Sequence, residues 1–304
     1  MTHIFILNPY TCTPEKISDL RERLKGITNL NYHIFTVSEP GSEKMIIDWI
    51  FDIFRDEEIR LYICGETAFA HHVINSMPSF DSAQIALYPC GATNSYLQVF
   101  EHSDRVRFRQ IEELVEGDVI DVDYIQTNRG ICLNAFSIGS DCNVLRATKA
   151  AGILGYWIKN LPKAVGLIVG VFSSKPVRME LTIDDQKFEG DYSQVFFGNA
   201  HTHMERIFYD DHADVTDGKA VLTMLPFKGH SFQFNYMYHL SKKDIKYVDE
   251  VGVRTYGKRL HVHNKEDKPF HINLDGVLQV SESDITVQVV KKGLQLVVPR
   301  GVRA

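Results

Sequence analysis

Three short polar segments each follow an apolar run in this sequence, and their residue types suit the binding of an anion. The segments are Asn8-Pro9 after residues 4–7, Gly65-Glu66-Thr67 after residues 59–64, and Pro89 to Ser95 after residues 85–88. Free backbone N–H groups at the start of a helix, together with the helix dipole, attract phosphates and carboxylates. Ordinary strand-to-helix connections are the alternative for any one segment. Together, the three predict an anion site where strands of an α/β sheet end.

The elements that must position these segments alternate along the first part of the chain. Strands are predicted at residues 4–7, 31–37, 59–64 and 85–88. The apolar spacing of amphipathic helices occurs at residues 13–24 and 43–55. This alternation predicts a doubly wound, mostly parallel α/β domain. From about residue 119 short strand patterns with turn signals dominate, which predicts a β-rich second domain, a sandwich.

Composition limits the class of protein. The chain has 304 residues, 44% hydrophobic and 24% charged, which favours two globular domains. A net charge of −6 argues against a nucleic-acid partner. No apolar run approaches the roughly 18 residues of a membrane span, and the first residues lack a basic segment typical of a signal peptide, so we expect a cytoplasmic protein. Five cysteines without C-x-x-C spacing indicate neither a disulfide framework nor a zinc site.

The order and spacing of several blocks resemble the diacylglycerol kinase catalytic family, soluble lipid kinases related to sphingosine kinases and, in the first domain, to NAD kinases. The blocks that carry the resemblance are Asn8-Pro9, Cys64-Gly65-Glu66-Thr67, Pro89-Cys90-Gly91-Ala92-Thr93-Asn94, Ile120-Asp121 and Asp275-Gly276. The run at 293–299 resembles the terminal strand of the family, which returns to the first domain. The resemblance implies an NAD kinase-like domain of residues 1–118 plus 291–304 and a β-sandwich acceptor domain of residues 119–290.

The resemblance also implies ligands and site residues. The reaction would transfer the γ-phosphate of ATP to a lipid hydroxyl such as that of diacylglycerol, in the cleft between the domains. The residues that would hold the nucleotide are Asn8, Gly65, Glu66, Thr67, Gly91, Thr93 and Asn94. Asp121 and Glu66 would hold a weakly bound Mg²⁺, and Asp275 would act on the acceptor side. A lipid acceptor allows peripheral contact with a membrane, although no contiguous amphipathic stretch indicates one.

Three departures from the family pattern weaken the predicted reaction. Val277 stands where the family has a glutamate, the general base, Ser95 replaces an acid, and Glu66 replaces an aspartate. Loss of a general base typically costs ~10² to 10⁴ in rate, so we expect a slow or inactive enzyme. His271 and His263 are other candidate bases. The alternatives are a catalytically dead protein that binds a nucleotide or lipid, and a kinase of another small hydroxyl compound.

Two His-x-His pairs are candidates for parts of a metal site. His201 with His203, and His261 with His263, would share a face of a strand. Zinc sites need three or four ligands, and no third ligand has a recognisable spacing. Solvated strand positions are therefore the favoured interpretation of both pairs.

Overall fold

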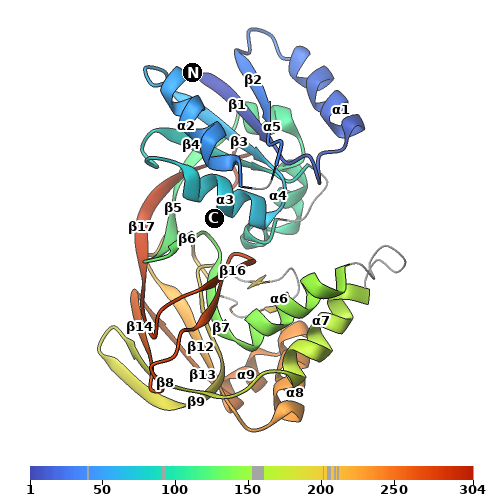
Figure 1. Ribbon diagram of the computed structural model, residues 1–304. Coiled ribbons are helices and arrows are strands. Elements are labelled where there is room, and N and C mark those ends of the chain that lie inside the picture. Colours follow the sequence, from blue (N-terminus) through green and yellow to red (C-terminus); the bar gives the residue numbers. More distant parts are fainter. Residues whose placement is uncertain are drawn as a thin grey trace. The chain divides into compact units, whose positions relative to one another are not determined.

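The computed structural model describes residues 1–39, 41–90, 94–152, 161–200, 202, 203, 207, 208, 210 and 212–303. The chain divides into two compact units (Figure 1). The first comprises Met1–Tyr124, Val215–Asp217 and Lys291–Ala304, and the second Ile125–Asp214 and Gly218–Val290. The first unit extends past residue 118, the expected limit, because strand β5 (Asp118–Thr127) begins there by pairing with strand β17 (Asp284–Val298).

The first unit is built on a parallel sheet. Its strands are β1 (Thr2–Leu7), β2 (Tyr32–Thr36), β3 (Ile59–Cys64) and β4 (Ala83–Tyr88). They lie in the order β2-β1-β3-β4, and β17 continues the sheet in parallel beside β4. Every residue of β1 and β3 is buried, as expected of central strands covered on both faces.

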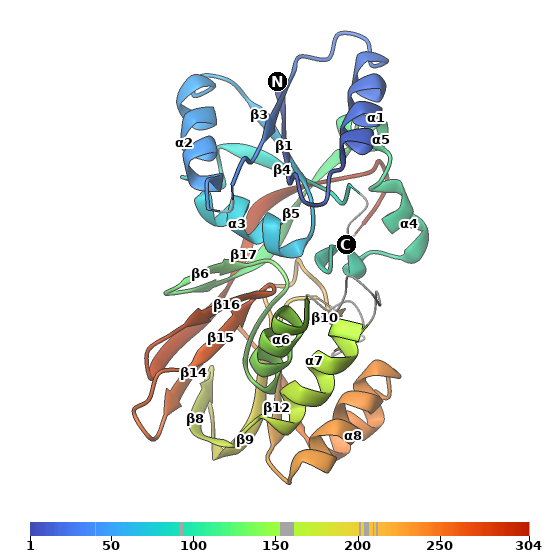
Figure 2. The same ribbon diagram turned by 45° about the vertical axis from the view of Figure 1, so that its right-hand side comes forward.

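Helices cover both faces of this sheet (Figure 2). On one face lie α1 (Pro14–Lys25) and α5 (Ile111–Val115), which contact each other, and on the other α2 (Glu43–Ile53) and α3 (Thr67–Ser76). The 3₁₀ helix η1 (Tyr96–Val99) and helix α4 (His102–Arg107) lead from β4 towards α5. The unit is therefore doubly wound, and its carboxyl strand ends form one edge.

The second unit is β-rich and mostly antiparallel. Its strands, besides parts of β5 and β17, are β6 (Gly130–Cys132), β7 (Ala135–Gly139), β8 (Val177–Ile183), β9 (Gln186–Gly198), β10 (Thr202–His203), β11 (Ile207–Phe208), β12 (Ala220–Pro226), β13 (Val253–Gly257), β14 (Arg259–Asn264), β15 (His271–Leu274) and β16 (Val277–Val280). Its helices are α6 (Ser140–Ala150), α7 (Leu161–Phe172), α8 (His230–Ser241) and α9 (Ile245–Val251).

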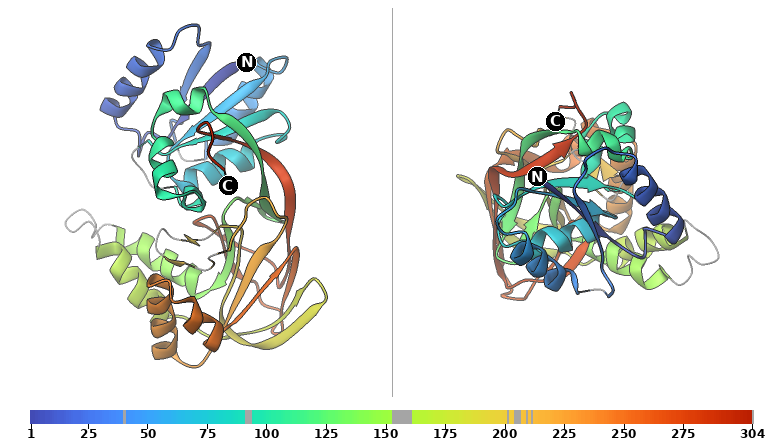
Figure 3. Two further views of the ribbon diagram at one scale, coloured as in Figure 1. Left: turned by 180° about the vertical axis from the view of Figure 1, so that it is seen from behind. Right: turned by 90° about the horizontal axis from the view of Figure 1, so that it is seen from above.

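Strand alternation divides the apolar side chains of the second unit between two cores. Phe197 and Leu222 point into a core made by the strands, whereas their neighbours Phe196 and Val221 point into a second core against the helices. Successive strand residues face opposite sides, so both faces of β9 and β12 are covered. Helices α7 and α8, yellow-green and orange in Figure 3, pack side by side on the helical side.

Two histidines are buried in the first unit without a balancing negative charge. Burial is the main cause that lowers the pKa of His3 from 6.5 to about 4, and the positive charge of Arg60 adds to it. His3 Nδ1 lies 2.8 Å from the hydroxyl oxygen of Tyr62. Burial also lowers the pKa of His71, on α3, to about 4. Both imidazoles are therefore neutral in the folded protein at pH 7.

We predict that the protein loses stability as the pH falls from about 6.5 to 4. The unfolded chain protonates these histidines near pH 6.5 and the folded chain only near pH 4, so each contributes stability that is present above 6.5 and disappears in this window. The free energy of unfolding should fall by at most roughly 3 kcal/mol per histidine. Urea unfolding of the protein at pH 7 and 4.5 measures it. The His71→Phe variant should lose less than the wild type, whereas the exposed control His102→Asn should behave as the wild type. An equal loss in all three proteins would contradict the assignment.

Candidate functional site

Asn8 links the loops that follow β1 and β3. Its side-chain Nδ2 donates to both carboxylate oxygens of Glu66, at 3.0 and 2.9 Å. Its Oδ1 accepts from the backbone N–H of Tyr10 at 3.0 Å, and its backbone N–H donates to the carbonyl of Cys64. A single buried amide thus holds the glutamate in place.

Gly65 and Glu66 form the turn from β3 into α3. A Cβ at Gly65 would lie 2.8 Å from Phe69 Cδ1 and 3.1 Å from Asn8 Cβ, so no larger residue fits without movement. Glu66 is the N-cap residue of α3, where a negative charge is favourable because of the helix dipole. The helix start that was predicted to attract a phosphate therefore already carries a carboxylate.

The loop after β4 is joined to α3 by Thr67. The Thr67 hydroxyl accepts from the backbone N–H of Ser95 at 2.8 Å, and Asn94 Oδ1 accepts from that of Tyr96 at 3.1 Å. Gly91 and Thr93, two predicted nucleotide contacts, lie outside the described residues. The element that follows this loop is the 3₁₀ helix η1, whose four residues are too few to supply a helix-dipole site for an anion. Of the predicted residues, the structure brings Asn8, Gly65, Glu66, Thr67 and Asn94 to one edge.

The structure does not bring Asp121 to that edge. Asp121 is exposed on β5, and three residues later the Tyr124 ring packs 5.2 Å from that of Phe80, which precedes β4. This part of β5 therefore lies at the amino end of β4, whereas Glu66 follows the carboxyl end of β3. The expected Mg²⁺ pair of Asp121 and Glu66 is thus not assembled. In the part of the chain that the structure describes, no group of three His, Cys, Asp or Glu residues could hold a metal ion.

The buried acid of β5 is Asp123, which the sequence reasoning missed. Its Oδ1 accepts from the backbone N–H of Lys292 at 2.7 Å, and its own N–H donates to the carbonyl of Val215. These bonds tie three separate segments of the first unit together. The alternation of Val122 and Asp123 gave only a weak signal, because the partners are far away in sequence.

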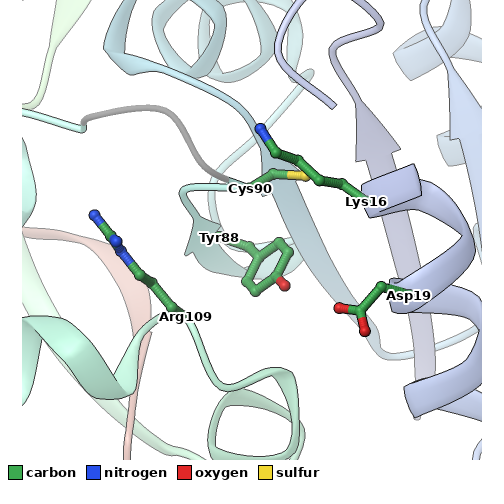
Figure 4. Close-up of a pocket in the computed structure, with 5 residues that line it drawn as sticks. All are labelled: Lys16, Asp19, Tyr88, Cys90 and Arg109. Carbon is green, nitrogen blue, oxygen red and sulfur yellow. The ribbon is translucent and has the colours of Figure 1, made fainter. Parts of the chain in front are cut away.

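A small pocket opens beside the carboxyl end of β4 (Figure 4). It is lined by Lys16 and Asp19 of α1, by Tyr88 and Cys90, and by Arg109, which precedes α5. Two cations and one exposed carboxylate give it a positive balance. Its volume of about 120 Å³ is below the roughly 300 Å³ of the smallest usual ligand pockets. The pocket can therefore take a phosphate group but not a whole nucleotide.

Three buried cysteines lie at the same edge. The single S–H of Cys12 can donate either to the carbonyl of Cys64, 3.2 Å away, or to the sulfur of Cys90. The bond from Cys12 to Cys90, with the positive charge of Lys16, lowers the pKa of Cys90, whereas the same bond and burial raise that of Cys12. Burial raises the pKa of Cys64. Cys90, which lines the pocket, is therefore the thiol with the most thiolate character.

Asp275 has a structural position in the second unit. Its Oδ2 accepts from the backbone N–H of Leu133 at 2.7 Å, and its Oδ1 from those of Asn134 and Ala135 at 3.0 and 2.9 Å. With Gly276 it forms the two-residue turn between β15 and β16, both residues having positive φ. A carboxylate that holds three backbone groups is poorly placed to take a proton from an acceptor. The structure favours an anchoring role over the predicted catalytic one.

Within the described part of the chain, the pair His261 and His263 forms no recognisable metal site. His261 Nε2 and His263 Nδ1 lie 3.1 and 3.0 Å from the two carboxylate oxygens of Asp284. The three side chains are at least partly exposed, and they are not among any metal-binding group found in the described residues. His201 lies outside the described residues, and only the backbone of His203 is described.

We predict that Asp275→Asn destabilises the protein. The amide offers one acceptor oxygen to three N–H groups, which should lower the free energy of unfolding by about 2–4 kcal/mol. Urea unfolding measures the change. Asp267→Asn is the matched control, because Asp267 is also a turn aspartate with positive φ, but its side chain is 82% exposed. A variant as stable as the wild type would contradict the anchoring role.

Solved structures similar to this chain identify its fold, whereas sequence comparison finds no match. The sequence matches no family model and no curated protein. A diacylglycerol kinase from Bacillus anthracis str. Sterne has a TM-score of 0.67 and 13% identity, over 99% of this chain and 98% of that chain. A second structure from this strain, of a proposed diacylglycerol kinase, has a TM-score of 0.74 and 15% identity over 99% and 96%.

An NAD kinase from Archaeoglobus fulgidus, determined in complex with ATP, has a TM-score of 0.52 and 9% identity over 99% of this chain and 94% of that chain. The TM-scores establish the fold, whereas sequence identities this low leave the activity open. The chain therefore has the two-part fold of the diacylglycerol kinase structures, related to that of NAD kinase.

Proposed function

We propose that this protein is an ATP-binding, lipid kinase-like protein whose first unit holds the nucleotide phosphates. The observation that supports this most directly is the linked set of loops at the carboxyl edge of the parallel sheet. Asn8 holds Glu66, and Thr67 holds the backbone of Ser95, so the loops after β1, β3 and β4 are fixed relative to one another. Ligands of open α/β sheets bind at such an edge.

The positive pocket beside this edge is the proposed place for a phosphate group. Lys16 and Arg109 supply the charge, and Cys90 and Tyr88 line the same space (Figure 4). Lys16 Nζ is held by the carbonyl of Thr11 at 3.1 Å, in the loop that leads from Asn8 into α1. One cation of the pocket is thereby attached to the loop network.

Glu66 is the residue that would hold Mg²⁺. Proteins bind this ion through one or two carboxylates together with substrate phosphates, so a single glutamate is sufficient only when the nucleotide is present. The bound ion would neutralise phosphate charge. Without it, the Glu66 carboxylate and the phosphates repel each other. We therefore propose that ATP binds as its magnesium complex and that Mg²⁺ alone binds weakly.

The proposed reaction is a slow transfer of the γ-phosphate to a lipid hydroxyl such as that of diacylglycerol. Positioning and charge neutralisation govern phosphoryl transfer, so a missing base reduces the rate without abolishing the reaction. A second candidate is a binding protein that no longer transfers phosphate. The hydrogen bonds of Asp275 favour this candidate. Because its carboxylate accepts from three backbone N–H groups, it is not available to replace the missing base.

Calorimetric titration with ATP tests the nucleotide site. In the wild type, replacing Mg²⁺ by a chelator should weaken binding at least about tenfold, since charges ~6 Å apart interact by roughly 3 kcal/mol at an effective dielectric constant of 20. In Glu66→Gln, binding with Mg²⁺ should weaken and binding with chelator should strengthen. Glu43→Gln, which changes an acid in the first turn of α2, is the control. Equal binding by the wild type and Glu66→Gln under both conditions would refute the role of Glu66.

Transfer of labelled phosphate from ATP to diacylglycerol in mixed micelles separates the two candidates. For a slow kinase, Val277→Glu should raise the rate at least tenfold, because it restores a carboxylate where the resemblance places the base. Val280→Glu, on the same strand and 55% exposed at the wild-type side chain, should not. No transfer by any of the three proteins, with ATP binding intact, would establish the second candidate.

A further inference from the structure

Helix α7 is apolar on its outer face as well as on its inner face. Leu167 and Val171 point inwards and pack in the core between the helices and the sheet. Ile168, Val169 and Phe172 point outwards and are 51%, 48% and 54% exposed. A surface helix of a globular protein normally carries polar residues on this side. The outer face of α7 therefore needs an explanation beyond folding.

Helix α8 continues this apolar surface. Tyr236 and Met237 are buried in the same core, whereas Phe234 and Tyr238, one helical turn apart, are 40% and 53% exposed. The two helices meet where the Phe172 ring lies 5.7 Å from that of His230, at the start of α8. We call the exposed residues Ile168, Val169, Phe172, Phe234 and Tyr238 the α7–α8 face.

Positive charges outnumber negative ones along α7, α8 and their flanks, although Asp244 lies 2.9 Å from His239 of α8 and Arg178 is paired with Glu189. The whole chain contains 39 acidic residues, yet none falls within residues 161–179 or 227–243, which include both helices and their flanks. These two segments carry six basic residues, Lys163, Lys175, Arg178, Lys228, Lys242 and Lys243. The exposed apolar residues of α2, in contrast, have Asp48 and Asp52 beside them. The α7–α8 face thus combines exposed apolar residues with a local excess of lysines in a protein of net negative charge.

Two lysines lie over aromatic rings of α8. Lys228 Nζ is 5.3 Å from the centre of the Phe232 ring, and Lys242 Nζ is 5.6 Å from that of Tyr238. A lysine that lies along an apolar surface and keeps its charge at the margin is suited to a boundary between an apolar and a polar phase. Such a boundary exists between lipid headgroups and acyl chains.

We propose that the α7–α8 face binds the surface of a bilayer that contains anionic phospholipids. Apolar side chains would enter the headgroup boundary, and the lysines would contact lipid phosphates. A second copy of the chain fits less well, because it would bring the same positive charges together. None of the described helices is long and apolar enough to cross a membrane, so the helices would lie on the surface. This proposal does not depend on ATP binding.

Sedimentation with lipid vesicles tests the proposal, without nucleotide in any sample. The wild type should bind vesicles of phosphatidylcholine mixed with phosphatidylglycerol, bind vesicles of phosphatidylcholine alone much more weakly, and lose binding as salt is raised. Phe172→Glu should weaken binding at least tenfold. Lys228→Ala and Lys242→Ala should each weaken it about fivefold.

Matched control variants distinguish binding through the α7–α8 face from nonspecific binding to vesicles. Met45→Glu, at a 66% exposed residue of α2, and Lys187→Ala, at an exposed residue of β9, should bind vesicles as the wild type does. Absence of wild-type binding to anionic vesicles would overturn the proposal. It would also be overturned if Met45→Glu lost binding and Phe172→Glu did not. A wild-type dimer in light scattering that Phe172→Glu converts to a monomer, without vesicle binding, would show a second copy on this face instead.

Discussion

The pair of hydrogen bonds from Asn8 to Glu66 is the interaction on which the first unit's proposed site depends. It fixes a carboxylate at the start of α3 and connects the loops after two neighbouring strands. Thr67, the next residue, extends the connection to the loop after β4. The side-chain bonds of Asn8 and Thr67 add to the backbone bonds at these strand ends, which include Asn8 N–H to the Cys64 carbonyl and Gly65 N–H to the Tyr88 carbonyl. An edge held in this way is preorganised, so binding a ligand there requires little further ordering.

The same glutamate limits what the edge can bind. A helix start usually attracts an anion, but the carboxylate of Glu66 already uses the favourable end of the α3 dipole. A phosphate can approach only with a cation that screens the two negative charges or towards the lysine and arginine of the neighbouring pocket. The proposed dependence on Mg²⁺ therefore rests on the charge of one residue, since no three-ligand metal group is found among the described residues.

Local patterns in the sequence were sufficient for the fold but insufficient for parts of the candidate site. The strand predicted at residues 59–64 is β3 (Ile59–Cys64), because a short run that is apolar except for Arg60 and is ended by glycine is typical of a buried strand. Asp121 lies on the exposed side of β5, and the buried acid of that strand is Asp123, whose partner Lys292 is distant in sequence. The Asp275-Gly276 pair carried a recognisable signal for a hairpin turn, which the resemblance to a catalytic motif obscured. The α7–α8 face joins residues from two separate segments, so no contiguous pattern reveals it.

The rate of alkylation of Cys90 in the native protein tests the proposed nucleotide site most directly. Cys90 lines the pocket proposed for a phosphate, and its lowered pKa makes it the thiol expected to react first. Mass spectrometry can follow each cysteine separately, with the fully buried Cys132 and Cys142 as internal controls. The account predicts that saturating ATP with Mg²⁺ slows the labelling of Cys90 at least about fivefold and that Mg²⁺ alone has no effect. An unchanged rate at saturating nucleotide would contradict the placement of the phosphates at this edge of the sheet.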